Sequence, residues 1–139
     1  MLRSGQILTG TIAYLDESSN GILMAGKDKV FVRHVLAKEK VKVKIQKRLK
    51  EGYSANVIEI LQKDKERIKP VCGIYERCGS CHLMHMSAQG QKHQKLSYLQ
   101  KLCAKNKQLH IKAEEIATMK HPYHYRNKMI IGFQKDKQG

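Results

Sequence analysis

The stretch that decides the fold is Lys40-Val41-Lys42-Val43-Lys44-Ile45. Its apolar residues alternate with lysines, and a period of two is typical of a β-strand with one buried face and one exposed face. A strand of this kind has to bury its apolar face against other elements. The stretch therefore predicts a sheet in which the three lysines point outward.

Four other segments around this stretch also have strand patterns. They alternate or form short apolar runs, turn residues such as Asn20-Gly21 separate them, and they comprise residues 7–13, 21–25, 30–32 and 56–60. Five short strands bury their apolar faces best by closing into a small barrel of the OB type, in which most strand edges are lost. We expect this barrel to span residues 1–61.

The pattern changes after the barrel. Residues 62–70 carry mixed charges and end in Pro70, as is typical of a linker. From Ser87 to Lys107 the apolar residues lie on one helix face, with Ser87 as a plausible N-cap, and residues 128–134 resemble an apolar strand. The expected fold class is β plus α/β: the barrel, the linker, and an incomplete domain over residues 71–139 that holds a cysteine-rich segment, a helix and a strand.

The chain is strongly basic. Its 27 Lys and Arg residues outnumber its 12 Asp and Glu residues, which gives a formal net charge of +15. This charge predicts a polyanionic partner, because each phosphate contacted by a cation releases counterions. A solvated basic surface is the alternative. The candidate phosphate-binding residues of the barrel are Lys27, Lys29, Arg33, Lys40, Lys42 and Lys44.

The sequence shows neither a secretory signal nor an apolar run of the roughly 18 residues that a membrane span needs. We therefore expect a cytoplasmic location and no membrane partner. Clustered thiols in a reducing compartment more often bind metal or carry out redox chemistry than form structural disulfides.

Three cysteines, Cys72, Cys78 and Cys81, lie within ten residues. The last two form a C-x2-C pair, and Gly79 between them frees the backbone to turn. Thiols at this spacing converge on one ion or on one face of a cluster, so they are the candidate metal ligands.

A closed four-ligand site needs one more donor. Cys103 lies on the predicted helix face, where a cysteine is usually part of the core. The remaining choices are a histidine, His82 or His85, which gives a zinc site, or a cysteine outside this chain, which gives an iron–sulfur cluster. The residues alone leave both open.

Together these features resemble the N-terminal part of the RNA uracil-5-methyltransferase family, whose members act on ribosomal or transfer RNA. The resemblance covers essentially the whole chain. It rests on the barrel, Pro70, the C-x5-C-Gly-x-C block with His85 after it, the glutamine- and lysine-bearing helix, and the run Tyr125-Arg126-Asn127-Lys128. In that family the leading barrel is a TRAM domain, an OB-like module that binds RNA.

The resemblance implies ligands and partners. Cys72, Cys78 and Cys81 would bind a [4Fe-4S] cluster whose fourth ligand lies outside this chain. The protein would act as a monomer, and its partner would be RNA, either rRNA or tRNA. The resemblance adds three residues to the predicted RNA contacts: Arg126, Asn127 and Lys128.

The resemblance also implies an S-adenosylmethionine-dependent methyl transfer. The sequence contains no G-x-G-x-x-G or comparable cofactor loop. We therefore expect the cofactor and the catalytic cysteine to belong to a C-terminal domain that is missing here, assign no catalytic residue, and expect this chain alone to be inactive. The alternative class is a non-enzymatic RNA-binding adaptor with a structural zinc site.

Overall fold

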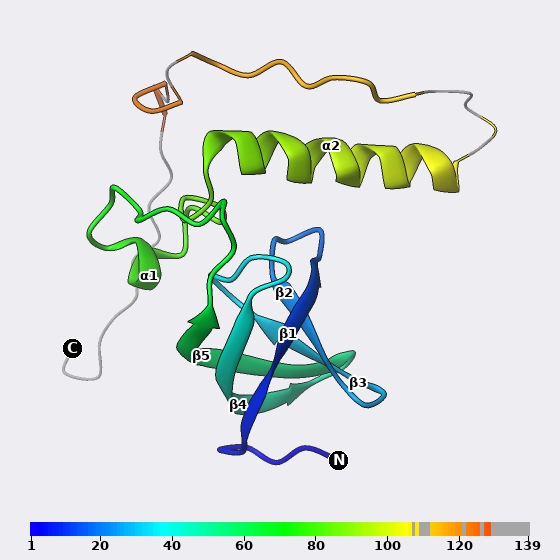
Figure 1. Ribbon diagram of the computed structural model, residues 1–139, viewed down its shortest axis with the longest axis vertical. Coiled ribbons are helices and arrows are strands. Elements are labelled where there is room, and N and C mark those ends of the chain that lie inside the picture. The colour runs from blue at the N-terminus through cyan, green and yellow to red at the C-terminus, as the bar shows by residue number, and fades with distance from the viewer. Residues whose placement is uncertain (107, 109–111, 121, 126, 129–139) are drawn as a thin grey trace.

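The computed structural model describes residues 1–106, 108, 112–120, 122–125 and 127–128. Within this part of the chain five strands come first and two helices follow (Figure 1). The strands and helices are β1 (Ile7–Leu15), β2 (Gly21–Ala25), β3 (Asp28–Val32), β4 (Lys40–Leu49), β5 (Gly52–Gln62), α1 (Tyr75–Cys78) and α2 (Ala88–Lys105). The predicted order of elements is confirmed for these residues.

The five strands form a closed barrel in the order β1-β2-β3-β5-β4. All neighbouring pairs are antiparallel except β3 and β5, which pair in parallel. Closure leaves no long strand edge exposed, and this is the physical reason to expect a barrel from five short strands. That prediction is confirmed.

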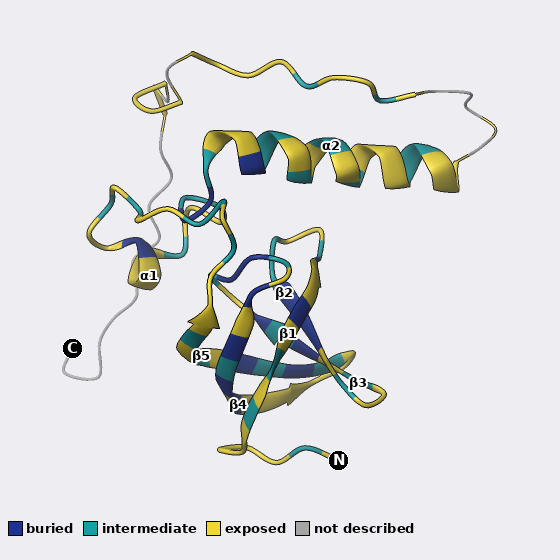
Figure 2. Ribbon diagram, in the orientation of Figure 1, coloured by how far each residue is buried: buried dark blue, intermediate teal, exposed yellow. Residues whose placement is uncertain are grey.

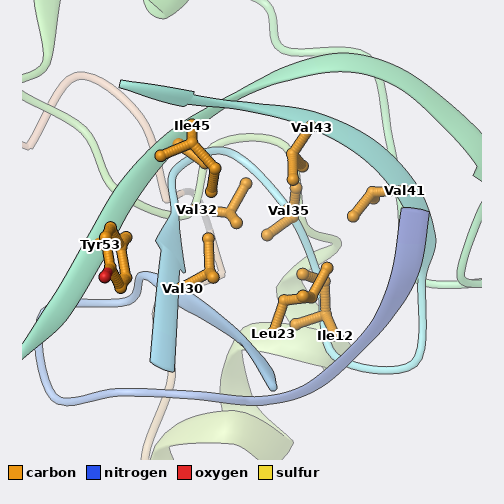
Figure 3. Packing of buried hydrophobic residues seen from close by; sticks show 10 residues of the cluster. Ile12, Leu23, Val30, Val32, Val35, Val41, Val43, Ile45 and Tyr53 are labelled. Carbon is orange, nitrogen blue, oxygen red and sulfur yellow. The ribbon is translucent and has the colours of Figure 1, made fainter. Parts of the chain in front are cut away.

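The barrel core consists of the inward residues of the alternating strands. Val41 and Val43 are fully buried and Ile45 is 1% exposed, while the lysines between them lie outside. Figure 3 shows the apolar side chains of several strands pointing into the same interior. At the start of β5, Gly52 has φ +152° and a Cβ there would lie 2.2 Å from the carbonyl oxygen of Lys29, so only glycine fits this turn.

Residues 62–70, expected to be a linker, are bonded to their surroundings. Gln62 still belongs to β5, and Arg67 forms an isolated β-bridge with Met86. A second small core joins Met86 to Leu15 and Leu36 of the barrel region. The chain after the barrel is therefore packed against it.

The predicted helix is confirmed with slightly shorter bounds. The Ser87 hydroxyl accepts a hydrogen bond from Gly90 N, as expected of an N-cap. The expected apolar face is less buried than the pattern suggested, because Leu99 is 41% exposed and Cys103 is only half-buried. Figure 2 shows α2 as mostly exposed or half-buried, in contrast to the barrel strands.

The strand expected over residues 128–134 falls almost entirely outside the described residues, and Lys128 itself is exposed and not part of a strand. In the described part of the chain no helix is long and apolar enough to cross a membrane.

Candidate functional site

The lysines of β4 line the outside of the barrel. Lys40 and Lys44 are exposed and Lys42 is half-buried, with fully buried residues between them. On the neighbouring β1 their partners are Thr11, Thr9 and Ile7, in the order Lys40, Lys42 and Lys44. We call these three lysines the lysine face.

The partners of the lysine face on β5 are mostly neutral. Lys40 pairs with Gln62 and Lys44 with Asn56, whereas Lys42 pairs with Glu59. One carboxylate therefore sits among three cations. A net positive strip with polar neighbours suits contacts to successive phosphates.

The other basic residues predicted to contact phosphate do not join the lysine face. Lys27 and Lys29 are exposed at the β2–β3 hairpin, and β5 lies between β3 and β4 in the barrel. Asn127 and Lys128 are exposed in the chain beyond α2, and Arg126 lies outside the described residues. Arg33 is exposed in the loop after β3, and its guanidinium group lies beside Gly79, away from the lysine face.

The three candidate metal ligands lie on one short segment, residues 72–81, which contains α1 and which we call the cysteine segment. Cys72 precedes the helix and is half-buried, Cys78 is its last residue and is exposed, and Cys81 follows and is exposed. Gly79 ends the helix in the left-handed conformation, with φ +71°. The backbone therefore turns between the last two thiols, as the C-x2-C spacing predicted.

All four cysteines are free thiols. Cys78 Sγ lies 3.2 Å from Ser80 Oγ, and hydrogen bonds from the side chain and the backbone of Ser80 lower the pKa of the Cys78 thiol. Stabilisation of the thiolate suits a metal ligand, because the thiolate is the form that coordinates.

The donor set fits a thiophilic metal centre, since three free thiols within ten residues flank a glycine turn. Their present arrangement is open. No group of three Cys, His, Asp or Glu side chains in the described part of the chain is arranged to hold a metal ion. The chemistry of the segment therefore matches the predicted ligands, whereas their side chains do not converge on one point in the described part of the chain.

His85, one of the two histidines considered as a zinc ligand, is committed to other bonds. It is 1% exposed, and its Nδ1 lies 2.6 Å from the Tyr75 hydroxyl while its Nε2 lies 3.2 Å from the Val35 carbonyl oxygen. Burial lowers the pKa of His85 to about 4, although the Val35 carbonyl acts in the opposite direction. His85 is thus a neutral structural residue that anchors the cysteine segment to the barrel, and His82 is the exposed alternative.

A buried ion pair fixes the chain just before the cysteines. Glu39 is fully buried and accepts hydrogen bonds from Arg67 Nε at 2.5 Å and Nη2 at 2.7 Å. It also accepts the backbone N–H groups of Leu36 and Asp64. Burial opposes ionisation, but the hydrogen bonds from Arg67 and from these backbone groups outweigh it and hold the pKa of the Glu39 carboxyl below its usual value.

Tyr75, Glu39 and Arg67 were not among the residues predicted from the sequence. Two signals for them exist: Glu39 is a lone acid between two lysines, and Tyr75 is the aromatic residue between the first two cysteines. Neither signal identifies the partner, which lies at least ten residues away in both cases.

A groove of about 770 Å³ lies between the barrel and α2. Its lining includes the aromatic residues Tyr14, Phe31 and Tyr98. Three lysines and three carboxylates also line it, namely Lys29, Lys101, Lys105, Asp16, Glu17 and Glu51. Because these charges cancel, the groove lacks the positive potential that a polyanion requires.

No protein-family model matches the chain. Curated relatives do match it. A Staphylococcus aureus (strain COL) protein is 28% identical over 138 residues, which is 99% of this chain and 30% of the relative. A Listeria monocytogenes serotype 4b protein is 30% identical over 139 residues, which is 99% of this chain and 31% of the relative. Both are named "Uncharacterized RNA methyltransferase".

The chain is homologous to proteins named RNA methyltransferases. A Clostridium acetobutylicum protein with the same name is 34% identical over 124 residues, which is 85% of this chain and 27% of the relative. The chain thus spans about 30% of the length of the curated relatives it matches.

Proposed function

We propose that this chain is the RNA-binding and iron–sulfur-binding part of an S-adenosylmethionine-dependent RNA uracil-5-methyltransferase that acts on rRNA or tRNA. The observation that carries the proposal is the match of almost the whole chain to proteins named RNA methyltransferases. The closed barrel with a lysine face and the three-thiol segment support it.

The lysine face supplies affinity for RNA rather than sequence recognition. Lysines act as point charges on phosphates, and they carry no fixed fork for reading base edges. Their spacing along β4 repeats every second residue, about 7 Å, which is close to the distance between successive phosphates of an extended single strand. The face therefore suits an RNA backbone that runs along β4.

The thiols of Cys72, Cys78 and Cys81 would hold a [4Fe-4S] cluster by three corners. The bound cluster would supply a covalent cross-link that closes this segment and joins it to a fourth ligand outside the chain. Zinc is the alternative metal, and its imidazole ligand would then be His82, since both ring nitrogens of His85 are engaged.

We assign methyl transfer to parts of the longer relatives that lie outside the match. S-Adenosylmethionine would bind there, and the residues described here would bind and orient the RNA. None of them is given a catalytic role.

RNA binding by the lysine face is tested by replacing Lys40, Lys42 and Lys44 with glutamine together. Binding to unrelated single-stranded RNAs should weaken to the same extent. The slope of log K against log [salt] should become shallower by up to about 0.7 for each phosphate that is no longer bound. Fluorescence anisotropy at several salt concentrations measures both.

The matched control replaces Lys95, Lys101 and Lys105, three exposed lysines of α2, with glutamine. This variant removes the same net charge from a different place. If both triple variants shift the salt slope equally, the lysine face is not the site and net charge alone explains binding.

A further inference from the structure

Two threonines of β1 lie beside the lysine face on the outside of the barrel. In the antiparallel register of β1 and β4, Thr9 lies opposite Lys42 and Thr11 lies opposite Lys40. Both threonines are exposed. Side chains directly opposite each other in such a pair lie on the same face of the sheet, with Cβ atoms about 4.5–5.5 Å apart. Two lysines of the lysine face therefore each have a hydroxyl-bearing neighbour.

The hydroxyl groups of Thr9 and Thr11 are available to a ligand. Gly10, between them, faces the interior, because a Cβ there would lie 3.1 Å from Cδ1 of the core residue Leu23. Successive residues of a strand point to opposite faces, so the two threonines project outward. In the part of the chain that the structure describes, no hydrogen bond engages either hydroxyl. Each can therefore donate one hydrogen bond to a ligand and accept others from it.

The charges around β4 favour an RNA backbone on the side of these threonines. On the opposite side, Lys42 pairs with Glu59 of β5, and Glu59 is exposed. A carboxylate repels phosphate, whereas β1 contains no acidic residue. A phosphate chain that follows the lysine face should therefore lie over β4 and β1 rather than over β4 and β5.

A hydroxyl beside a cation matches the arrangement of groups along an RNA strand. The ribose 2′-hydroxyl is attached to the carbon next to the one that carries the 3′-phosphate, so each phosphate has a hydroxyl close to it. DNA lacks this hydroxyl, and contacts to it allow a protein to distinguish the two nucleic acids. A threonine hydroxyl can bond to the 2′-hydroxyl while the lysine opposite it contacts the phosphate. The pairs Thr9–Lys42 and Thr11–Lys40 offer this combination at two successive outward positions.

We propose that Thr9 and Thr11 select RNA over DNA by hydrogen bonding to 2′-hydroxyl groups of a strand whose phosphates contact Lys42 and Lys40. The inference rests on the RNA binding proposed for the lysine face and extends it. Lysines bind the phosphates of both nucleic acids, so they supply affinity without choosing between the sugars. The threonines supply that choice and are specificity-determining residues.

The test replaces both threonines with valine in the whole chain. Valine keeps the branched shape of threonine and is favourable in a strand, but it has no hydroxyl. Fluorescence anisotropy at one salt concentration gives the Kd values for RNA and DNA single strands of the same length and base sequence, with deoxyuridine in place of uridine. The unchanged chain should prefer RNA. Each hydroxyl removed should raise the Kd for RNA by about two- to tenfold and leave the Kd for DNA unchanged.

Two further variants control this measurement. Thr118→Val makes the same substitution at an exposed position beyond α2 and should leave both Kd values unchanged. The double variant Thr9→Ser, Thr11→Ser keeps both hydroxyls and should retain most of the preference for RNA. Circular dichroism confirms that each variant keeps its fold, which is expected because the substituted positions are exposed.

The outcomes distinguish this inference from the function on which it rests. If the triple glutamine variant of the lysine face binds RNA as tightly as the unchanged chain, the function proposed for that face fails, and the inference fails with it. If the lysines matter but the valine variant keeps the full preference for RNA, the role of the threonines is overturned while the lysine face stands. Equal weakening of RNA and DNA binding in the valine variant would also overturn it, because the threonines would then not recognise the sugar.

Discussion

The barrel and the chain after it are stabilised in different ways. The barrel has its own core of ten buried side chains contributed by its strands and the loop after β3. Among the described residues after β5, only Tyr75, His85, Met86 and Gly90 are buried. His85 and Met86 are buried by contacts with the barrel region, so the chain after β5 uses the barrel surface as part of its core. The lysine face thus lies on a region with its own hydrophobic core, whereas the thiols lie on a region that depends on the barrel for its packing.

The largest expected effect on stability comes from removing Arg67, whose ion pair with Glu39 joins the two regions. Arg67→Met leaves the fully buried Glu39 without its partner, and breaking a buried pair in this way typically costs about 3–5 kcal/mol of unfolding free energy. Urea unfolding followed by circular dichroism measures the loss.

The double variant Glu39→Gln, Arg67→Met serves as the control for this prediction. It removes the uncompensated charge and should be clearly more stable than Arg67→Met alone. A single variant as stable as the unchanged protein would show that the ion pair does not hold the two regions together.

The barrel could be predicted from sequence because its information is local. Val41, Val43 and Ile45 alternate with lysines, and this alternation states which side chains are buried before any partner is known. The helix start at Ser87 was predictable for the same reason, since a cap acts within one turn.

The contacts that place the cysteine segment could not be predicted in this way. Glu39 meets Arg67 across 28 positions, and His85 meets Val35 across 50. Such polar pairs follow no periodicity, and their partners are decided by how the barrel presents its β3–β4 loop. The thiol spacing was therefore enough to propose ligands for the centre, whereas the residues that support them became visible only in the folded chain.

The next largest effect is a pH dependence of the unfolding free energy, which arises from His85 in the chain after the barrel. Because burial lowers the pKa of His85 to about 4, the folded chain binds this proton less readily than the unfolded chain, whose histidine titrates near 6.5. Stability should be fully present above pH of about 6.5 and should fall as the pH drops towards 4, by about 3 kcal/mol in all. The groups around His85 that shape this response are Tyr75, His34, Arg67 and Glu39.

Unfolding free energies measured at intervals across this range test the assignment to His85. In His85→Asn the decrease in stability on acidification should largely disappear, although the variant starts from a lower stability because it lacks the ring. The matched variant His93→Gln, at an exposed position on α2, should keep the full pH dependence. Equal pH dependence in all three proteins would assign the effect to other groups.

The smallest effect is expected on the apolar face of α2, and it measures how far the two regions differ. Leu99 is 41% exposed, so truncation to alanine removes little buried area, and alanine is the better helix former. Leu99→Ala should therefore change the unfolding free energy by less than about 1 kcal/mol, whereas Ile45→Ala, at a position 1% exposed in the barrel, should cost about 2–5 kcal/mol. Chemical denaturation of both variants under the same conditions allows their losses of unfolding free energy to be compared directly. A decrease at Leu99 as large as that at Ile45 would mean that α2 has a core of its own, and the cysteine segment before it would then not depend on the barrel alone.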